Sequence, residues 1–385
     1  MESNRRKFLR QSLTTAAGLA AAAIPGGLSA EVINRRPIIS REKANPLKTC
    51  ANLIRFAAIG LNHGHINGQV ETVIRGGGEF VSFYAKEPDL AAAFSKRFPQ
   101  AKLARSEQEI LDDKSIHLVV SASIPNERAP LGIRVMQHGK DFMADKPGIT
   151  TLEQLAEVKK VQKQTRRIYS ILYGERMENK ASIRAGQLIR EGAIGKVVQT
   201  LGTGPHRMNP QSRPEWFFDK KAYGGIICDI GSHQCEQFLY FTNSKKAEVL
   251  CSQVGNVHNS QYPGLEDFGD ATVRGDGGSG YFRVDWFTPK GLKSWGDGRL
   301  TILGTDGYME LRKNIDIVGR EGGNHLFLVD HNDTRYIDCS EVELPYGPAL
   351  VQDILNRTET AMTQEHCFLA TELALKAEKQ AVKMG

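Results

Sequence analysis

Strands and helices alternate from residue 54 to residue 144, and this alternation limits the possible folds more than any other feature of the sequence. The apolar run Ile54–Ile59 is typical of a buried strand, and a glycine-containing turn and a helix-like stretch follow it directly. Alternation over about a hundred residues predicts a parallel, doubly wound sheet, whose ligands bind at the carboxyl ends of the strands. The expected strands are 54–59, 80–84, 103–104, 118–121, 141–144 and 169–173, and the expected helices are 66–75, 90–98, 107–111 and 129–138.

The turn after the first strand has the position of a phosphate-binding loop but not its usual glycines. It reads Gly60-Leu-Asn-His-Gly-His, so Asn62 and His65 stand where a G-x-G-x-x-G loop has its second and third glycines. A strand, a turn and a helix N-terminus still predict an anion site, because free backbone N–H groups and the helix dipole converge there. We expect Gly60, Asn62, His63, Gly64 and His65 to contact a dinucleotide.

The residues after the second strand leave the choice of nucleotide open. Where a ribose-binding acid is usual, the chain has Ala85-Lys86-Glu87. Lys86 favours contact with the 2′-phosphate of NADP or is simply solvated, whereas Glu87 could replace the missing acid and serve NAD. We therefore expect NAD or NADP, with more weight on NADP or dual use.

His63 and His65 also form an H-x-H pair of the kind that binds metals. No third ligand is near them in the sequence. We therefore expect no metal and assign both histidines to nucleotide or substrate contact, or to stabilisation of the turn.

The N-terminus has the pattern of an exported protein. Residues 4–10 read Asn-Arg-Arg-Lys-Phe-Leu-Arg, and an uncharged stretch and small residues follow up to Ala30. This pattern predicts a twin-arginine signal peptide over 1–30 and a linker over 31–51, with a disordered or membrane-anchored terminus as the alternative. The apolar stretch is short and broken at Pro25, so we expect no stable membrane span. The twin-arginine machinery would then be a partner, the location would be the periplasm, and a cofactor could be loaded tightly before export.

Charge and cysteine content exclude several classes of protein. The formal net charge is +6, and residues 1–30 carry +3 of it, from four basic residues against Glu2. The remaining +3 gives no electrostatic reason to expect nucleic-acid binding. The six cysteines show no C-x-x-C pair and no zinc-like spacing.

An acid, an imidazole and a second acid recur at helical spacing in the second half of the chain. Asp229, His233 and Glu236 would share one face of a helix and could handle protons together. A surface ion pair or a structural histidine is the simpler interpretation of this spacing alone.

Several short motifs together resemble the glucose-fructose oxidoreductase / inositol dehydrogenase / rhizopine catabolism (Gfo/Idh/MocA) family over residues 53–310. The triplet Asp145-Lys146-Pro147 is similar to the family's Glu-Lys-Pro, and Arg128 stands where a histidine is often found. The other matching positions are Pro125 and Asn126, the stretch 192–196, Gly224, Gly225, Asp229, Gly231 and His233.

The resemblance implies an α/β protein of two domains. An NAD(P)-binding Rossmann domain would cover 52–174, an α/β domain with a large open, mainly antiparallel sheet would cover 175–348, and helices would cover 349–385. It further implies a homo-oligomer formed through the open sheet. Pro125, Asn126, Asp145 and Lys146 would join the turn residues and Lys86 at the cofactor.

The same resemblance implies catalytic roles that agree with the chemistry of alcohol oxidation. Lys146 would stabilise the developing alkoxide, His233, near its natural pKa, would transfer the proton, and Asp229 would assist. Asp229 and His233 would also bind substrate, together with Arg176, and with His206 and Arg213 from the loop 204–218. Glu175 and Arg176 could instead form a structural ion pair, and Trp286 and Trp295 fit sheet packing or a subunit contact better than catalysis.

The function that follows is an NAD(P)-dependent oxidoreductase acting on a hydroxyl of a sugar or polyol. Two alternatives stay open. One is a glycosidase that oxidises its sugar transiently with bound NAD and eliminates the glycosidic bond. The other is a nucleotide-binding protein without catalysis, which the irregular turn and Ala85 would favour.

Overall fold

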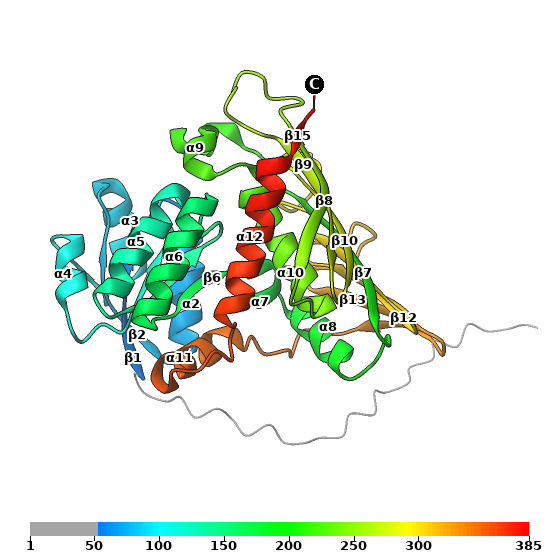
Figure 1. The fold of residues 1–385 in the computed structure, drawn as a ribbon, viewed down its shortest axis with the longest axis horizontal. Coiled ribbons are helices and arrows are strands. Elements are labelled where there is room, and N and C mark those ends of the chain that lie inside the picture. Colours follow the sequence, from blue (N-terminus) through cyan, green and yellow to red (C-terminus); the bar gives the residue numbers. More distant parts are fainter. Residues whose placement is uncertain (1–52, 385) are drawn as a thin grey trace, which may run out of the picture. The chain divides into compact units, whose positions relative to one another are not determined.

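The computed structural model describes residues 53–384, so the expected signal peptide (1–30) and the expected linker (31–51) lie outside the described residues. Figure 1 shows two sheets with helices around them. Strand and helix bounds agree with the sequence expectations to within a few residues.

The first sheet is parallel and six-stranded, in the order β3-β2-β1-β4-β5-β6. This is the doubly wound order of dinucleotide-binding folds. The strands β1, β4, β5 and β6 are short and buried almost throughout, as their apolar runs require, whereas β2 is partly buried and the edge strand β3 is exposed. The strands are β1 (Ile54–Ile59), β2 (Gly78–Tyr84), β3 (Lys102–Leu103), β4 (Leu118–Ser121), β5 (Asp141–Asp145) and β6 (Tyr169–Leu172), and the helices are α2 (Ile66–Arg75), α3 (Pro88–Arg97), α4 (Glu107–Asp112), α5 (Pro125–Gln137) and α6 (Leu152–Thr165).

The second sheet has nine strands in the order β14-β13-β12-β11-β7-β10-β9-β8-β15. It is mainly antiparallel, and only the β7–β10 and β8–β15 pairs run parallel. The strands are β7 (Val197–Pro205), β8 (Ala247–Gly255), β9 (Phe268–Gly275), β10 (Gly278–Asp285), β11 (Arg299–Gly304), β12 (Gly307–Arg312), β13 (His325–Asp330), β14 (Thr334–Ile337) and β15 (Val382–Lys383).

Helices from the second half of the chain connect the two sheets. Helix α10 packs against β7 and β10, and α12 packs against α10, β8 and α6. The C-terminal chain also returns to the first sheet, where α11 packs on α2. The helices of this half are α7 (Gly174–Met177), α8 (Lys180–Arg190), α9 (Lys220–Tyr223), α10 (Ser232–Thr242), α11 (Tyr346–Asn356) and α12 (Gln364–Gln380).

The expected fold class, a Rossmann sheet followed by an α/β domain with a mainly antiparallel sheet, is confirmed. Three local expectations need correction. Pro125 and Asn126 form the first turn of α5 rather than a loop, a π-helix (Ile227–Gly231) precedes α10, and the C-terminal end adds the short strand β15. Within residues 53–384, no helix combines the length and apolar character needed to cross a membrane.

Candidate functional site

A cavity of about 670 Å³ lies between the carboxyl ends of the first sheet and the inner side of the second domain. Its lining joins residues more than 200 positions apart in the chain, from His63 to Asn314. Eight expected site residues that carry charge or an imidazole reach it together with aromatic side chains. They are His63, His65, Asp145, Lys146, His206, Arg213, Asp229 and His233.

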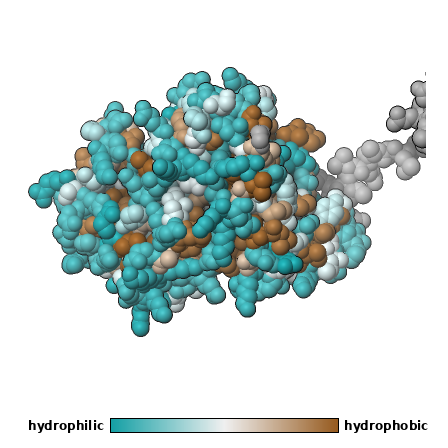
Figure 2. Space-filling view, turned by 45° about the horizontal axis from the view of Figure 1, so that its top comes forward, coloured by the Kyte–Doolittle hydropathy of each residue, from teal (hydrophilic) through white to brown (hydrophobic). Residues whose placement is uncertain are grey.

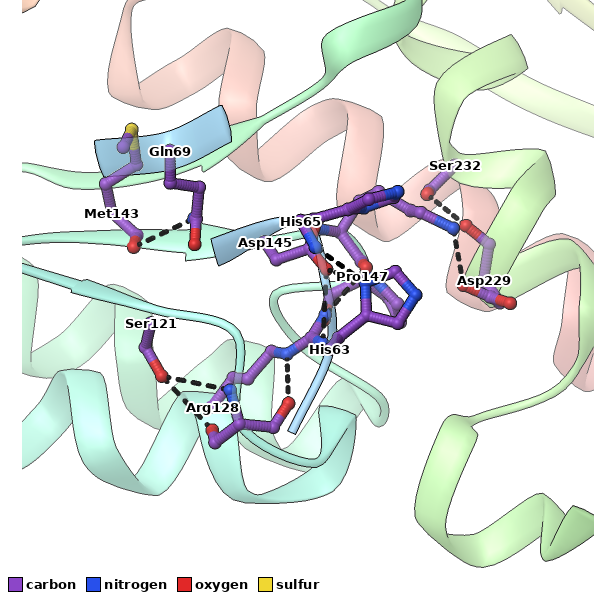
Figure 3. A network of polar contacts seen from close by, with 12 residues as sticks. His63, His65, Gln69, Ser121, Arg128, Met143, Asp145, Pro147, Asp229 and Ser232 are labelled. Carbon is purple, nitrogen blue, oxygen red and sulfur yellow. Dashed lines mark hydrogen bonds and ion pairs between the residues drawn. The ribbon is translucent and has the colours of Figure 1, made fainter. Parts of the chain in front are cut away.

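Asp145 anchors the turn after β1. Its carboxylate lies 3.0 Å from Nδ1 of His65 and 3.2 Å from Nδ1 of His63. Figure 3 shows the two rings meeting at this carboxylate. Burial alone would raise the pKa of Asp145, but His65, Arg128 and the hydrogen bonds from both histidines outweigh burial and hold the pKa well below its usual range. His63 and His65 thus tie the turn after β1 to the end of β5.

Arg128 binds the same carboxylate from the other side. Its guanidinium lies 3.3 Å from Oδ2 of Asp145, and it donates hydrogen bonds to the carbonyls of Ser123, Lys146 and Pro147 at 2.7, 2.6 and 3.1 Å. Arg128 is buried, so these bonds compensate for its desolvation. The arginine in the place of a family histidine therefore fixes the backbone that carries Lys146.

His63, His65 and Asp145 also form a group of side chains that could hold a metal ion. The sequence argument against a metal was that a third ligand is missing, and that premise is wrong, since Asp145 supplies one from the end of β5. The charge of Arg128 nevertheless argues against a metal ion at this position, because its guanidinium contacts the same carboxylate and would repel a cation. We retain the assignment of both histidines to the turn.

Lys146 and Asp229 meet across the cavity. Nζ of Lys146 donates to Oδ1 of Asp229 at 2.8 Å, and the two side chains are 6% and 15% exposed. Burial alone would raise the pKa of Asp229, but the ammonium of Lys146 outweighs burial and the pKa lies below its usual value. The pair brings a fixed cation from the first sheet to an acid from the second domain.

A π-helix presents Asp229. The segment Ile227–Gly231 has the wider turn, and α10 continues from Ser232. Wider turns of this kind insert a residue into a helix and occur often at functional sites. Asp229 and His233 both line the cavity, whereas Glu236 does not. The prediction that all three residues share one face at the site is therefore wrong for Glu236.

His233 is a buried, neutral imidazole. Burial lowers its pKa to about 3, and the nearby carboxylate of Glu175 acts in the opposite direction. The expectation of a near-natural pKa is therefore wrong. Nδ1 of His233 is buried without a hydrogen-bond partner among the described residues. At neutral pH the ring is thus in the form that accepts a proton.

Glu175 forms a charged network behind His233. Its Oε2 accepts hydrogen bonds from Lys313 at 2.7 Å, from Gln234 at 3.0 Å and from Gln237 at 3.3 Å. Burial alone would raise the pKa of Glu175, but Lys313 and the nearby histidines outweigh burial and lower it. The carboxylate is therefore ionised and lies where it favours a proton on His233.

Arg176 lies outside the cavity lining. Its Nε is 2.5 Å from Oε1 of Glu236, its guanidinium lies 4.1 Å from the Tyr240 ring centroid, and His366 contacts the same Glu236 oxygen at 3.1 Å. The structure thus places Arg176 in a buried ion pair with Glu236, not with Glu175 and not at the substrate. Of the two neighbours, Glu175 is the one that reaches the cavity.

An aromatic wall forms the other side of the cavity. The His206 ring lies 5.4 Å from the ring of Trp286 and 4.6 Å from that of Trp295, and the Arg213 guanidinium lies 5.1 Å from the Trp286 ring. Trp216 also lines the cavity. Trp286 and Trp295, which the sequence assigned to sheet packing or a subunit contact rather than to catalysis, both line the cavity.

The tautomer of His206 follows from one contact. Its Nδ1 lies 3.1 Å from the carbonyl oxygen of Gly204, which only accepts, so Nδ1 carries the proton and Nε2 is left as an acceptor. Burial lowers the pKa of His206 to about 4. The ring is therefore a neutral acceptor for a hydroxyl group.

A second cavity of about 300 Å³ lies on the other side of the β1 turn. Gly60, Asn62, Lys86 and Asn126 line it, whereas His63, Gly64, His65, Pro125 and Lys146 line the first cavity. The residues expected at the cofactor thus divide between two cavities that share one turn, which suits a molecule with two ends.

The turn between the cavities fits a dinucleotide. Gly60 has φ +80°, and a side chain there would collide with Ser123. The first turn of α2 holds no acidic residue that would repel an anion and no side-chain cap, although the N–H groups of Ile66 and Asn67 donate to the carbonyls of His63 and Gly64.

Sequence reasoning missed the polar residues that reach the site from distant elements. Lys313 lies just after β12, and no local motif marks it. Arg207 lies in the loop 204–218, and no motif in the sequence gives it a role. Its guanidinium donates to the carbonyls of Pro289 at 3.1 Å and Ser294 at 2.7 Å, and so holds the segment that carries Trp295.

Comparison with known proteins agrees with this fold. Residues 54–173 match the family model described as an oxidoreductase family with an NAD-binding Rossmann fold, and residues 183–310 match the GFO/IDH/MocA C-terminal domain. The chain is therefore an NAD-binding Rossmann protein. It belongs to the Gfo/Idh/MocA oxidoreductase family.

The chain is also similar to individual proteins of known name or structure. A solved structure from Erwinia carotovora atroseptica is 46% identical, covers 86% of this chain and 100% of its own, and has a TM-score of 0.84. Levoglucosan dehydrogenase of Pseudarthrobacter phenanthrenivorans is 27% identical over 236 residues, 59% of this chain and 57% of that protein. A levoglucosan dehydrogenase solved with NADH and levoglucosan shares the fold, with 18% identity, a TM-score of 0.69 and coverage of 85% and 96%. An NADP-dependent scyllo-inositol 2-dehydrogenase of Bacillus subtilis is 25% identical over 39% of this chain and 41% of its own. The matched segments thus span about half the length of these two curated relatives.

Proposed function

We propose that this protein is an NAD(P)-dependent oxidoreductase that transfers a hydride between a carbinol carbon of a sugar or polyol and the nicotinamide. The observation that carries the proposal is the Lys146–Asp229 contact of 2.8 Å beside the neutral His233, all in one cavity. A cation, an acid and a proton acceptor around one space meet the needs of alcohol oxidation.

The residues divide the reaction between them. A bound nicotinamide would accept the hydride, with both electrons of the C–H bond. His233 takes the hydroxyl proton as the C=O bond forms, and Lys146 stabilises the charge that develops on the oxygen. Glu175 favours the protonated form of His233, and Asp229 orients Lys146 and a substrate hydroxyl.

The cavity supports a substrate with several hydroxyl groups. His206 offers an acceptor, Arg213 a donor, and Trp286 and Trp295 flat apolar faces, a combination that suits a sugar ring. The names of the relatives point to an anhydro sugar and an inositol as substrates of those proteins. Both support the sugar or polyol class for this chain.

The direct test uses His233→Asn with His138→Asn as a matched control. His138 is a surface histidine at the end of α5, outside both cavities. We expect the His233 variant to lose at least about a hundred-fold in turnover of a sugar or polyol panel while nucleotide binding persists. The control should keep its turnover. Undiminished turnover in the His233 variant would remove this residue from the mechanism.

The same assays separate the alternatives. Mass spectrometry of the native protein should find a bound nicotinamide nucleotide, or titration should show binding. Release of an aglycone from aryl glycosides without net nicotinamide reduction would contradict net oxidation and favour the glycosidase. Nucleotide binding without turnover of any kind would favour a protein that has lost catalysis.

We also propose export by the twin-arginine pathway, which rests on residues 1–30 alone. Substitution of Arg5 and Arg6 by Lys should retain a tagged full-length protein in the cytoplasm, whereas the unchanged protein reaches the periplasm. Equal periplasmic amounts of both would contradict this location.

A further inference from the structure

The lining of the second cavity carries both basic and acidic side chains. Its lining contains two basic residues, Lys86 and Arg134, and three acidic ones, Glu87, Glu107 and Glu127. Each basic residue lies near an acid. Arg134 binds both oxygens of Glu107 at 2.7 and 3.2 Å, and Nζ of Lys86 lies 3.8 Å from Glu127. Glu87 is thus the lining acid without a basic partner among the described residues.

Glu87 is held in place by the turn after β1. Its Oε1 accepts a hydrogen bond from Nδ2 of Asn62 at 2.8 Å. Although Glu87 is the N-cap residue of α3, its side chain does not cap that helix. The carboxylate is therefore turned toward the dinucleotide turn, and Oε2 is left to accept from a ligand. Asn62, which stands in the place of the second glycine of the turn, therefore positions the Glu87 carboxylate.

The N-terminus of α3 offers little to a phosphate. Pro88 at the start of the helix removes one N–H group, and Asp89 already places a carboxylate in the first turn. A 2′-phosphate would bring about two further negative charges next to Glu87 and Asp89. A ribose hydroxyl, in contrast, is neutral and donates to a carboxylate.

We propose that the protein selects NAD over NADP, and that Glu87 is the residue that decides the choice by accepting a hydrogen bond from the adenosine ribose. The proposal revises the expectation from the sequence, which favoured NADP through a contact of Lys86 with the 2′-phosphate. Lys86 is exposed and lies near Glu127. The inference rests on the proposed function only in that a nicotinamide dinucleotide binds at the turn.

The test is binding, measured without turnover. The purified full-length protein is titrated with NADH and with NADPH, and the nicotinamide fluorescence gives each Kd. We expect NADH to bind at least about ten-fold more tightly, the size of one hydrogen bond to a charged group. In Glu87→Gln the amide can still accept from Asn62, but the charge is gone, so the ratio should fall to within about three-fold. Lys86→Ala serves as the matched control and should leave the wild-type ratio unchanged.

Three results would overturn the inference. They are NADPH binding as tightly as NADH in the wild type, an unchanged ratio in Glu87→Gln with a wild-type melting temperature, or a selective loss of NADPH binding in Lys86→Ala. Failure of both nucleotides to bind would instead overturn the proposed function itself.

Discussion

Nζ of Lys146 lies 2.8 Å from Oδ1 of Asp229, although 83 positions separate the two residues in the chain and each belongs to a different sheet-bearing half. Each charge is nearly buried, so each depends on the other for compensation. This mutual dependence can be measured.

The first prediction concerns this pair. Lys146→Met should lower the free energy of unfolding by about 3 kcal/mol, because it leaves the Asp229 carboxylate without its cation. The double variant Lys146→Met/Asp229→Asn should be more stable than Lys146→Met alone, since the orphaned charge is removed too. Urea unfolding of the two single variants and the double variant checks the cycle. Additive losses would show that the two charges do not depend on each other.

The sequence was sufficient for the fold and for the motif residues. Strand–helix alternation predicted the first sheet, and the Asp-Lys-Pro triplet and the Gly-Gly segment led to Lys146, Asp229 and His233. Residues whose position depends on distant elements could not be found in this way. Lys313 reaches Glu175 from the far sheet, and no spacing along the chain records that contact.

Two errors have a clear physical origin. Helical spacing placed Glu236 beside Asp229 and His233, but the chain enters α10 through a π-turn, and Glu236 instead pairs with Arg176. The absence of a third ligand for His63 and His65 was judged along the sequence, whereas Asp145 arrives from β5, which the topology places next to β4.

The second prediction is loss of stability in acid. The pKa values of His63, His206 and His233 lie at about 4, 4 and 3, mainly because of burial. Below the unfolded pKa of about 6.5, the unfolded chain binds protons that the folded chain refuses. The free energy of unfolding should therefore fall as the pH drops from about 6.5 toward 4, by up to about 1.4 kcal/mol per pH unit for each histidine.

Three carboxyl groups among the described residues work against this trend. Burial raises the pKa of Glu378 to about 7, so the folded chain holds that proton and gains stability as the pH falls from about 7 to 4.5. Burial also raises the pKa values of Glu178 and Asp285. The pKa shifts of the three histidines are together larger, so the net effect is a loss of stability in acid. In His206→Gln the free energy of unfolding should depend less steeply on pH, because the contribution of one histidine is removed. Urea unfolding at several pH values measures this slope. An unchanged slope would contradict the low pKa of His206.

The third prediction concerns the entry to the π-helix. Gly225 has φ +96°, and a Cβ atom there would collide with the carboxylate of Glu378. That carboxylate accepts from the N–H of Ile227 at 3.0 Å, so Gly225→Ala would disturb the start of the segment that carries Asp229. Gly192→Ala is the matched control, because Gly192 has φ +81° but open space around it.

Gly192→Ala measures only the free-energy cost of a side chain at positive φ, about 1 kcal/mol. We expect Gly225→Ala to cost at least about 2 kcal/mol more, as overpacking does, and also to lower turnover. Thermal unfolding and activity of both variants decide the matter. Equal losses of stability in the two variants would show that the Glu378 side chain moves aside at little cost and does not position the segment that carries Asp229.

The fourth prediction is a homo-oligomer formed through the outer face of the nine-stranded sheet. Helix α10 covers the other face of β7 and β10. On the outer face, Leu201 pairs with Tyr281 and Leu303 with Tyr308, and all four side chains are exposed. Figure 2 shows hydrophobic residues interrupting the hydrophilic surface in the half of the view where Figure 1 draws this sheet. Neighbouring exposed apolar side chains of this kind favour association.

Leu201→Glu should break that association, because a carboxylate would have to be buried in an apolar contact. Leu103→Glu is the matched control, since Leu103 is similarly exposed but lies on the edge strand of the first sheet. Light scattering after size exclusion should give a multiple of the monomer mass for the wild type and for Leu103→Glu, and a smaller mass for Leu201→Glu. A monomeric wild type at micromolar concentration would contradict the assembly, and an unchanged mass for Leu201→Glu would place the contact elsewhere. None of these four sheet residues lines the cavity, so Leu201→Glu should retain nucleotide binding even as a monomer.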